Sequence, residues 1–255
     1  MIRAWLALAV LLSGTARGAG PTYSAAGIVN TPNYTLGPFA PNAVVTIFGS
    51  GLARSAQGVD LAPGAPQLPT EINFVRVYVS DQPAALFYVS GSQINFLMPS
   101  TGKPGNVTIR VVTEGVSGPY VTATLVDAVP ALFPMAGGYA IATHADNTLL
   151  TADSPALAGD IVVIYLTGLG WTSPNPAPGQ ILPGAAQMVS LSDLKVSLGG
   201  TAVDPILIKY AGSTPGSAGL YQINLMLPAN VGTDPEVRVA VAGQSSPAGL
   251  KLAVR

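Results

Sequence analysis

The chain has 255 residues, no cysteine, a single histidine and a formal net charge of −1 at pH 7. A slightly acidic chain lacks the cationic surface that drives nucleic-acid binding, and one histidine without cysteine excludes an ordinary zinc site. Only 9% of the residues are charged, against roughly 25% in typical soluble domains. The surface is therefore either covered by Ser, Thr, Asn and Gly or made to contact a partner, and the Thr, Ser and Gly scattered through the loops favour the first explanation for most of it.

The first 18 residues have the pattern of a secretory signal peptide. Arg3 supplies a positive start, residues 5–12 form a short apolar core, and Ala16 and Gly18 are small residues at the cleavage-determining positions. That core is far shorter than the roughly 20 residues of a bilayer-spanning helix. We expect export without a transmembrane segment, after which 9 basic residues face 12 acidic ones and the net charge is −3.

Strand-like segments dominate the rest of the chain. β-Branched and aromatic residues alternate with polar ones, and the runs are broken by clusters drawn from 29 glycines and 23 prolines. No stretch of helical length keeps a 3.6-residue apolar spacing without a glycine or proline. The sequence therefore predicts an all-β fold.

The strand-like segments of the first half return in the same order in the second half. The matching pairs are 44–48 with 161–165, 75–79 with 194–198, 93–99 with 222–228, and 107–112 with 237–241. The spacing changes only in stretches rich in Gly, Pro and Ser, where surface loops accept insertions. This predicts two tandem β-sandwich domains, at residues 19–130 and 131–255, that arose by internal duplication and are held by packing alone.

The pairs Gln93 and Asn95, and Gln222 and Asn224, recur at the same place in the duplicated strand. Period-two alternation puts them on the face opposite Ile94 and the other core residues. We expect these repeated amides to be structural, bonding the backbone of a neighbouring loop.

Two long irregular segments, residues 53–70 and 171–187, follow equivalent Gly-Leu turns and should leave the same end of their domains. The second begins with Trp171, which is the only tryptophan left after removal of the signal peptide. Trp171 either contacts a sugar or a partner, or packs on the prolines of its own loop or over the domain junction.

Residues suited to catalysis or to metal binding are scattered. His144 and Asp146 share a predicted turn, but no Gly-x-Ser-x-Gly elbow supplies a nucleophile. Asp153 and Asp160 flank a Ser-Pro turn without the Asp-x-Asp-x-Asp pattern of a calcium loop. We expect no catalytic residue, no metal and no cofactor, and hence a protein that is not an enzyme.

Several stretches together resemble a known family: 27–30, 39–41, 45–53, 86–89, 93–96, 165–170 and 219–224. The chain resembles the uncharacterised C-terminal domain family of secreted acidobacterial (Solibacter-type) proteins, and each half resembles an immunoglobulin-like domain of the IPT/TIG type. It departs from the family at residues 144–147, where His-Ala-Asp-Asn replaces the usual Asn-x-Asp-Gly turn. The resemblance implies spacer or interaction domains of surface proteins.

We therefore expect a secreted, non-catalytic tandem module with a structural, adhesive or protein-interaction role at the cell envelope or outside the cell. The alternative is a carbohydrate-binding module that uses the proline-rich loop around Trp171. The expected partner is a protein or a polysaccharide at the cell surface, and not a nucleic acid.

Overall fold

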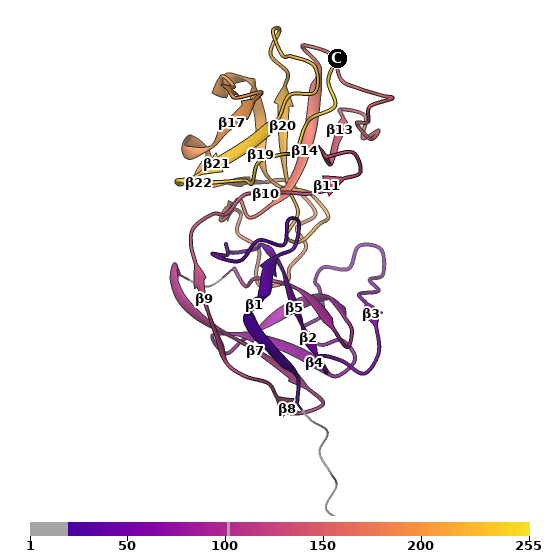
Figure 1. The fold of residues 1–255 in the computed structure, drawn as a ribbon, viewed down its shortest axis with the longest axis vertical. Helices are drawn as coiled ribbons and strands as arrows, with labels where there is room; N and C mark the ends of the chain where they lie inside the picture. Colours follow the sequence, from indigo (N-terminus) through magenta and orange to yellow (C-terminus); the bar gives the residue numbers. More distant parts are fainter. Residues whose placement is uncertain (1–19, 101–102) are drawn as a thin grey trace, which may run out of the picture.

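The computed structural model describes residues 20–100 and 103–255, so the predicted signal peptide lies outside the described residues. Within this part the chain is all-β, apart from two short 3-10 turns. Figure 1 shows the strands gathered into two units stacked along the long axis, with β1–β9 in the lower unit and β10–β22 in the upper one. No helix of the described residues is long and apolar enough to cross a bilayer.

The lower unit, which we call the first domain, contains nine strands. They are β1 (Thr22–Asn30), β2 (Val44–Ser50), β3 (Gln57–Gly58), β4 (Val75–Val79), β5 (Gln82–Val89), β6 (Gln93–Leu97), β7 (Gly105–Thr113), β8 (Val116–Ser117) and β9 (Val121–Leu125). Their hydrogen-bonded order is β1-β2-β6-β5-β4-β7-β8, with β3 paired to β5 and β9 to β7. All the pairs are antiparallel, and the β4–β5 hairpin joins the two layers into one continuous sheet.

The upper unit, the second domain, is built from shorter pieces. They are β10 (Ala131–Leu132), β11 (Pro134–Met135), β12 (Tyr139–Ala140), β13 (Ala142–His144), β14 (Ile161–Thr167), β15 (Thr172–Ser173), β16 (Ala186–Met188), η1 (Leu191–Asp193), β17 (Lys195–Leu198), β18 (Thr201–Ala202), η2 (Pro205–Leu207), β19 (Ile208–Ser213), β20 (Tyr221–Met226), β21 (Val237–Val241) and β22 (Gln244–Ser245). One sheet runs β10-β14-β20-β19-β16-β15, and a second runs β18-β17-β21-β22.

The two domains share the arrangement of their central strands. In the first domain β6 lies between β2 and β5, and β4 pairs with β7; in the second domain β20 lies between β14 and β19, and β17 pairs with β21. These are the segments that the repeated sequence matches. The prediction of two duplicated β-sandwich domains in an all-β chain is therefore confirmed.

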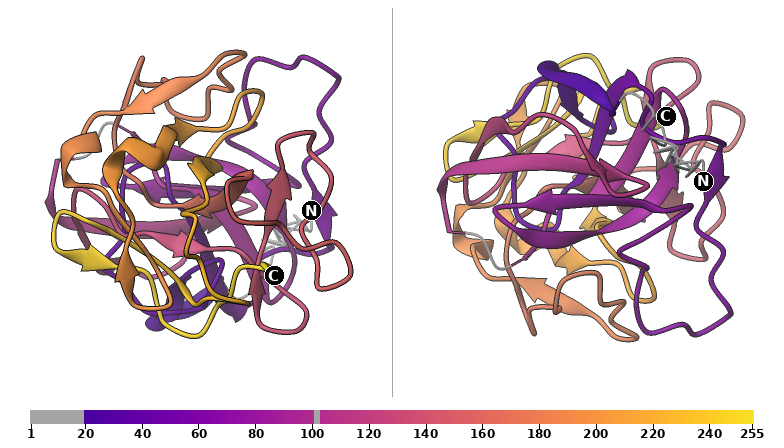
Figure 2. Two further views of the ribbon diagram at one scale, coloured as in Figure 1. Left: turned by 90° about the horizontal axis from the view of Figure 1, so that it is seen from above. Right: turned by 90° about the horizontal axis from the view of Figure 1, so that it is seen from below.

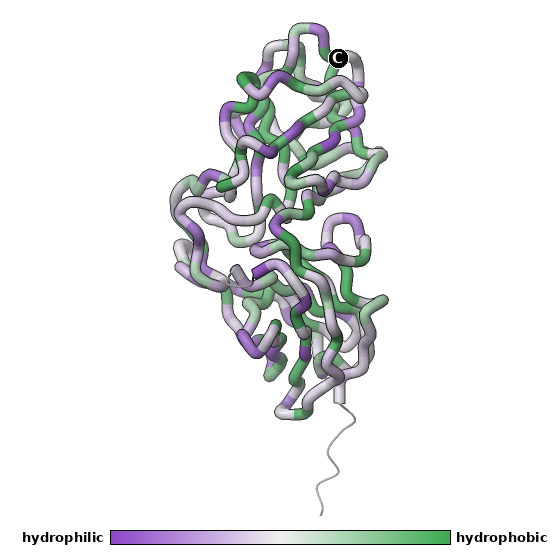
Figure 3. The backbone as a smooth tube through the Cα atoms, turned by 90° about the vertical axis from the view of Figure 1, so that its left-hand side faces the viewer, coloured by the Kyte–Doolittle hydropathy of each residue, from purple (hydrophilic) through white to green (hydrophobic). Residues whose placement is uncertain are grey.

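Alternation along the central strand fills both cores. Ile94 and Phe96 of β6, and Ile223 and Leu225 of β20, are fully buried, each pair in the cluster of its own domain. Figure 3 shows hydrophobic segments along the strands of both halves, with more hydrophilic segments in the connections. Burying one face of each central strand therefore fixes which side chains remain on the other face.

The connection between the domains is anchored to the start of a loop in the second domain. The backbone N–H of Val129 donates to the carbonyl of Gly168 at 2.8 Å. Gly168 has a φ of +79°, and a Cβ at this position would lie 2.0 Å from the carbonyl oxygen of Val129. The close approach of the two backbones therefore requires glycine.

Replacing Gly168 with alanine should lower the free energy of unfolding by about 2 kcal/mol or more, because positive φ and a backbone clash act together. Chemical denaturation monitored by fluorescence measures the change. Gly232→Ala is the matched control, since a Cβ at Gly232 meets nothing within 4 Å and its φ is not positive. Equal losses in the two variants would contradict the close-approach explanation.

Candidate functional site

The repeated amides lie as matched pairs on the outward face of the central strands. Gln93 Nε2 donates to Asn95 Oδ1 at 2.9 Å, and Gln222 Nε2 donates to Asn224 Oδ1 at 2.8 Å. The repeated sequence predicts bonds from these amides to the backbone of a neighbouring loop. In the structure the amides instead bond to each other along the strand, because residues two apart share a face.

In the first domain the amide pair continues into a chain of hydroxyl groups. Thr46 Oγ1 donates to Asn95 Oδ1 at 3.0 Å, and the Thr31 and Thr46 hydroxyl oxygens are 2.9 Å apart. Since the proton of Thr46 goes to Asn95, Thr31 must donate to Thr46. Asn95 Oδ1 thus accepts from Gln93 and Thr46 together, and within the described residues Asn95 Nδ2 and Gln93 Oε1 keep no side-chain partner.

Aromatic side chains flank this amide pair. Phe48 of β2 pairs in register with Gln93, and Tyr88 of β5 pairs with Asn95. Directly paired residues of an antiparallel ladder share a face, with Cβ atoms about 5 Å apart. Tyr34 completes the group, because its ring centroid lies 5.7 Å from that of Phe48 at an interplanar angle of 55°.

We call Tyr34, Phe48, Tyr88, Gln93 and Asn95 the aromatic-amide face. Tyr34 is 60% exposed and Phe48 39% exposed, which is unusual for large apolar side chains that contact each other. Sequence reasoning missed the three aromatic residues. The alternation in 44–48 was the signal that could have found Phe48, since it puts Thr46 and Phe48 on the outward face.

The second domain has the same framework but a different outward surface. Val163 occupies the position of Thr46, Tyr165 that of Phe48 and Tyr210 that of Tyr88. The Tyr210 hydroxyl lies 2.7 Å from the carbonyl oxygen of Ser213 and accepts from the N–H of Ala186 at 3.2 Å. Burial raises the pKa of Tyr210. Its hydroxyl is thus engaged with the backbone of its own strand β19 and of the neighbouring strand β16.

Trp171 is half-buried and directly precedes β15. Its carbonyl accepts the N–H of Val189 at 2.8 Å, which ties the start of its loop to the end of the same loop. Further along this loop, Gln180 forms an antiparallel bridge with Gln67 of the first domain. The loop therefore serves the domain junction, and contact of Trp171 with a ligand stays a prediction.

His144 and Asp146 do not form a catalytic pair. His144 Nε2 lies 3.1 Å from the carbonyl oxygen of Ser154, so this nitrogen carries a proton and cannot accept one from the serine hydroxyl 3.4 Å away. Asp146 Oδ1 accepts from the N–H and the hydroxyl of Thr148, and these bonds lower the pKa of Asp146. The carboxylate that would orient a catalytic histidine thus holds a turn.

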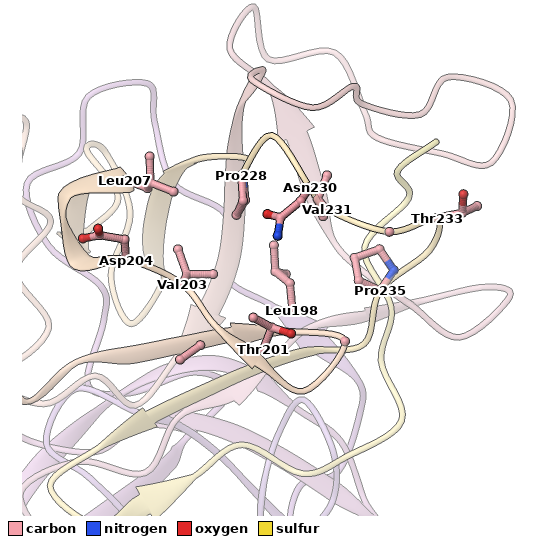
Figure 4. A pocket seen from close by; sticks show the side chains of 13 residues that line it. Leu198, Thr201, Val203, Asp204, Leu207, Pro228, Asn230, Val231, Thr233 and Pro235 are labelled. Atoms are coloured by element: carbon pink, nitrogen blue, oxygen red, sulfur yellow. The ribbon is translucent and has the colours of Figure 1, made fainter.

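Two hollows of the described residues, one in each domain, are also poorly suited to catalysis. One, of about 430 Å³, lies between the β17–β18 hairpin and residues 228–235, and Figure 4 shows Asp204 at one end beside Leu207. Its lining contains one ionisable residue, Asp204, whose Oδ1 accepts from the N–H of Ile206 and caps η2. The other hollow, of about 450 Å³, lies between β1 and β9 and is lined by uncharged, mostly apolar residues.

Within residues 20–100 and 103–255, no group of three or more Asp, Glu or His side chains is placed to hold a metal ion. The four ion pairs of this part of the chain are isolated pairs on or near the surface. The described residues therefore assemble no recognisable acid-base or metal site. The aromatic-amide face is the arrangement with most capacity to bind a ligand.

The comparison with protein families matches the first domain. Residues 32–125 match the family described as IPT/TIG domain, and this range runs from the end of β1 to the end of β9. The first domain is an IPT/TIG domain. No curated protein matches the chain.

Matches among solved structures include surface glycan-binding proteins and an S-layer protein. PbSGBP-B, a surface glycan-binding protein from Prevotella bryantii, has 14% identity over 91% of this chain and 42% of its own, with a TM-score of 0.30. SGBP-B of the mixed-linkage glucan utilisation locus of Bacteroides ovatus has 11% identity over 85% of this chain and 43% of its own, with a TM-score of 0.31. Domains 5–6 of the S-layer protein SbsC have 9% identity over 92% of this chain and 98% of their own, with a TM-score of 0.27.

The chain spans about two fifths of the length of the first two of these proteins. The TM-scores are near 0.3 and the identities are below 15%. For this reason the ligands of these proteins are not assigned to this chain. The IPT/TIG assignment rests on the family match alone.

The hydroxyl chain of the IPT/TIG domain can be tested by Thr46→Val, which keeps the shape of the side chain. Thr46 is fully buried, so the variant should lower the free energy of unfolding by about 1 kcal/mol through lost hydrogen bonds. Urea denaturation measures the change. Thr122→Val, on exposed β9, removes a hydroxyl without a side-chain partner among the described residues and should change stability by less than about 0.5 kcal/mol. An equal effect of the two changes would rule out a stabilising Thr46 bond.

Proposed function

We propose that the protein is an exported, non-catalytic module whose two β-sandwich domains form one rigid unit with a structural or adhesive role at the cell surface. The observation that carries the proposal is the seam, by which we mean the contact made by residues 53–70 and 171–187 together with Thr167. Freely jointed tandem domains have few contacts across their boundary, whereas a rigid spacer requires many.

The two long loops pair with each other across the seam. The N–H of Leu68 donates to the carbonyl of Gly179 at 2.9 Å, and the N–H of Ile181 donates to the carbonyl of Pro66 at 2.8 Å. The antiparallel bridge between Gln67 and Gln180 lies between these two bonds. The two long segments, which follow equivalent turns of the two domains, therefore join the domains to each other.

A small apolar cluster lies beneath this loop pairing. Leu68, Ala85 and Leu97 of the first domain are buried together, with Ile181 and Ala218 of the second domain packed against them. Figure 2 shows the molecule end-on, with the second domain in front in the left view and the first in front in the right view. Apolar burial and backbone hydrogen bonds thus act together across the junction.

Thr167 connects the two domains through one side chain. Its hydroxyl accepts the N–H of Val44 at 3.1 Å and donates to the carbonyl of Gly219 at 2.7 Å. Gly219 lies so close to the first domain that a Cβ would be 2.6 Å from Leu97 Cδ1. The start of β2 is thereby fixed to the end of β14, its counterpart in the second domain.

Other features support export and a surface role. The signal-like residues 1–18, the resemblance to secreted acidobacterial domains and the low fraction of charged residues agree with an extracellular module. We place the boundary of the domains at residue 130, between the last strand of the first domain and β10. The proposed partner is a protein or polysaccharide of the cell surface.

Thr167→Val should weaken the seam, because it leaves the buried N–H of Val44 and the carbonyl of Gly219 without a partner at a cost of about 1–3 kcal/mol. We expect calorimetry to resolve two transitions in place of one, and small-angle scattering to show a larger radius of gyration.

Thr113→Val is the matched control, since the Thr113 hydroxyl donates to the carbonyl of Leu52 at 2.7 Å inside the first domain. This variant should lose comparable stability without a change in scattering. A Thr167→Val protein that melts and scatters like the control would show that the seam does not hold the domains together.

A further inference from the structure

The aromatic-amide face has the chemistry of a sugar-binding surface. We propose that it binds a neutral polysaccharide chain, which names the ligand class for the adhesive role and so rests on the proposed function. The site lies on the IPT/TIG domain, on the outward side of β2, β6 and β5. The loop that carries Trp171 packs on the adjoining part of β5 and β6, at Ala85 and Leu97.

The first support is the arrangement of the rings. Phe48 and Tyr88 lie on strands on either side of β6, so they are about 10 Å apart across the sheet, with the amide pair between them. Tyr34 extends the surface beyond Phe48 and is inclined to it by 55°. Exposed rings that are inclined to each other suit a twisted chain of sugar units, whose C–H faces stack on aromatic rings.

The second support is that the backbone holds Tyr34 in a strained position. Tyr34 has a φ of +54°, which costs an L-residue roughly 1–2 kcal/mol. The turn is held by Asn33 Oδ1, which accepts from the N–H of Thr35 at 3.0 Å and from its hydroxyl at 2.7 Å. What distinguishes Tyr34 from Phe74, which also has a positive φ and an exposed ring, is that the turn holds the Tyr34 ring against a second ring, Phe48.

The third support is the hydrogen-bonding capacity of the amides. The hydroxyls of Thr31 and Thr46 and the amide of Gln93 fix the orientation of Asn95, so Asn95 Nδ2 remains a preset donor. Gln93 Oε1 remains an acceptor on the same face. Sugar hydroxyl groups both donate and accept hydrogen bonds. They therefore match a surface on which a donor and an acceptor lie next to each other between aromatic rings.

Charge narrows the class of ligand. None of the five residues of the face is charged, and the ion pairs of the described residues are formed by other side chains. Nucleic acids, acidic polysaccharides and anionic lipids would require Lys or Arg at the surface. Uncharged amides and aromatic rings favour a neutral glycan.

The second domain provides an internal comparison. Its equivalent surface keeps the amide pair Gln222 and Asn224, but Val163 replaces the threonine that orients the first pair. The hydroxyl of Tyr210 is held by neighbouring backbone, and Tyr165 is half-buried. We therefore assign one glycan site to the chain, on the IPT/TIG domain.

Affinity electrophoresis tests the proposal, with the purified protein run in gels that contain mixed-linkage β-glucan, galactomannan, arabinoxylan or the acidic polysaccharide alginate. We expect retardation by at least one neutral polysaccharide and none by alginate. Phe48→Ala and Tyr34→Ala should each weaken the binding at least about tenfold, as expected for central aromatic contacts. Gln93→Ala should weaken it severalfold.

Two further substitutions separate ring stacking from general hydrophobic contact. Phe48→Tyr keeps the ring and should keep most of the affinity, whereas Phe48→Leu keeps an apolar side chain without a ring and should lose it. Phe74→Ala is the control variant, since Phe74 is 67% exposed and directly precedes β4, outside the face. Melting temperatures check that each variant is folded.

The outcomes that overturn the proposal are distinct. No retardation in any neutral gel, retardation by alginate alone, or equal binding by Phe48→Leu and the wild type would each overturn it. Loss of binding in Trp171→Ala with full binding in Phe48→Ala and Tyr34→Ala would move the site to the loop of the second domain. Scattering of the same samples reports separately on the rigid junction, so failure of glycan binding is distinguishable from failure of the proposed rigid module.

Discussion

Burial of one face of the central strand is the constraint on which the rest of this structure depends. Ile94 and Phe96 in β6, with Ile223 and Leu225 in β20, must enter the two cores. Alternation then forces Gln93 and Asn95, and their counterparts in β20, onto the opposite face. Neighbouring strands have to adopt the same register, so Phe48 and Tyr88 are carried outward beside the amides. Packing of the core thus determines which side chains of the first domain lie on its outward face.

The two domains share this buried face of the central strand, but they differ at positions outside the core. Interior positions match closely, while Thr46 and Phe48 on the outward side correspond to Val163 and Tyr165. The edges differ as well, because one long strand, β1, pairs with β2 whereas the short strands β10 and β13 share β14. A duplicated scaffold can therefore keep its folding information and still present two different surfaces.

The sequence predicted the strands, their order and the buried residues well, because those depend on local alternation and on the repeat itself. It predicted that loops 53–70 and 171–187 leave equivalent places, but not that they pair, since backbone hydrogen bonds between loops leave no residue pattern. The partners of Gln93 and Asn95 were missed for a similar reason. Their bonds depend on the register with β2, which brings Thr46 next to them. The position of Tyr34 depends on a positive φ that asparagine or glycine would ordinarily signal.

The loop pairing at Gln67 and Gln180 also limits how this protein can evolve. An excised copy would expose Leu68, Ala85 and Leu97 to water and leave the edge of a loop without its hydrogen-bonding partner. The heritable unit is consequently the pair of repeats, and insertions in either loop must be matched by compensating change in the other.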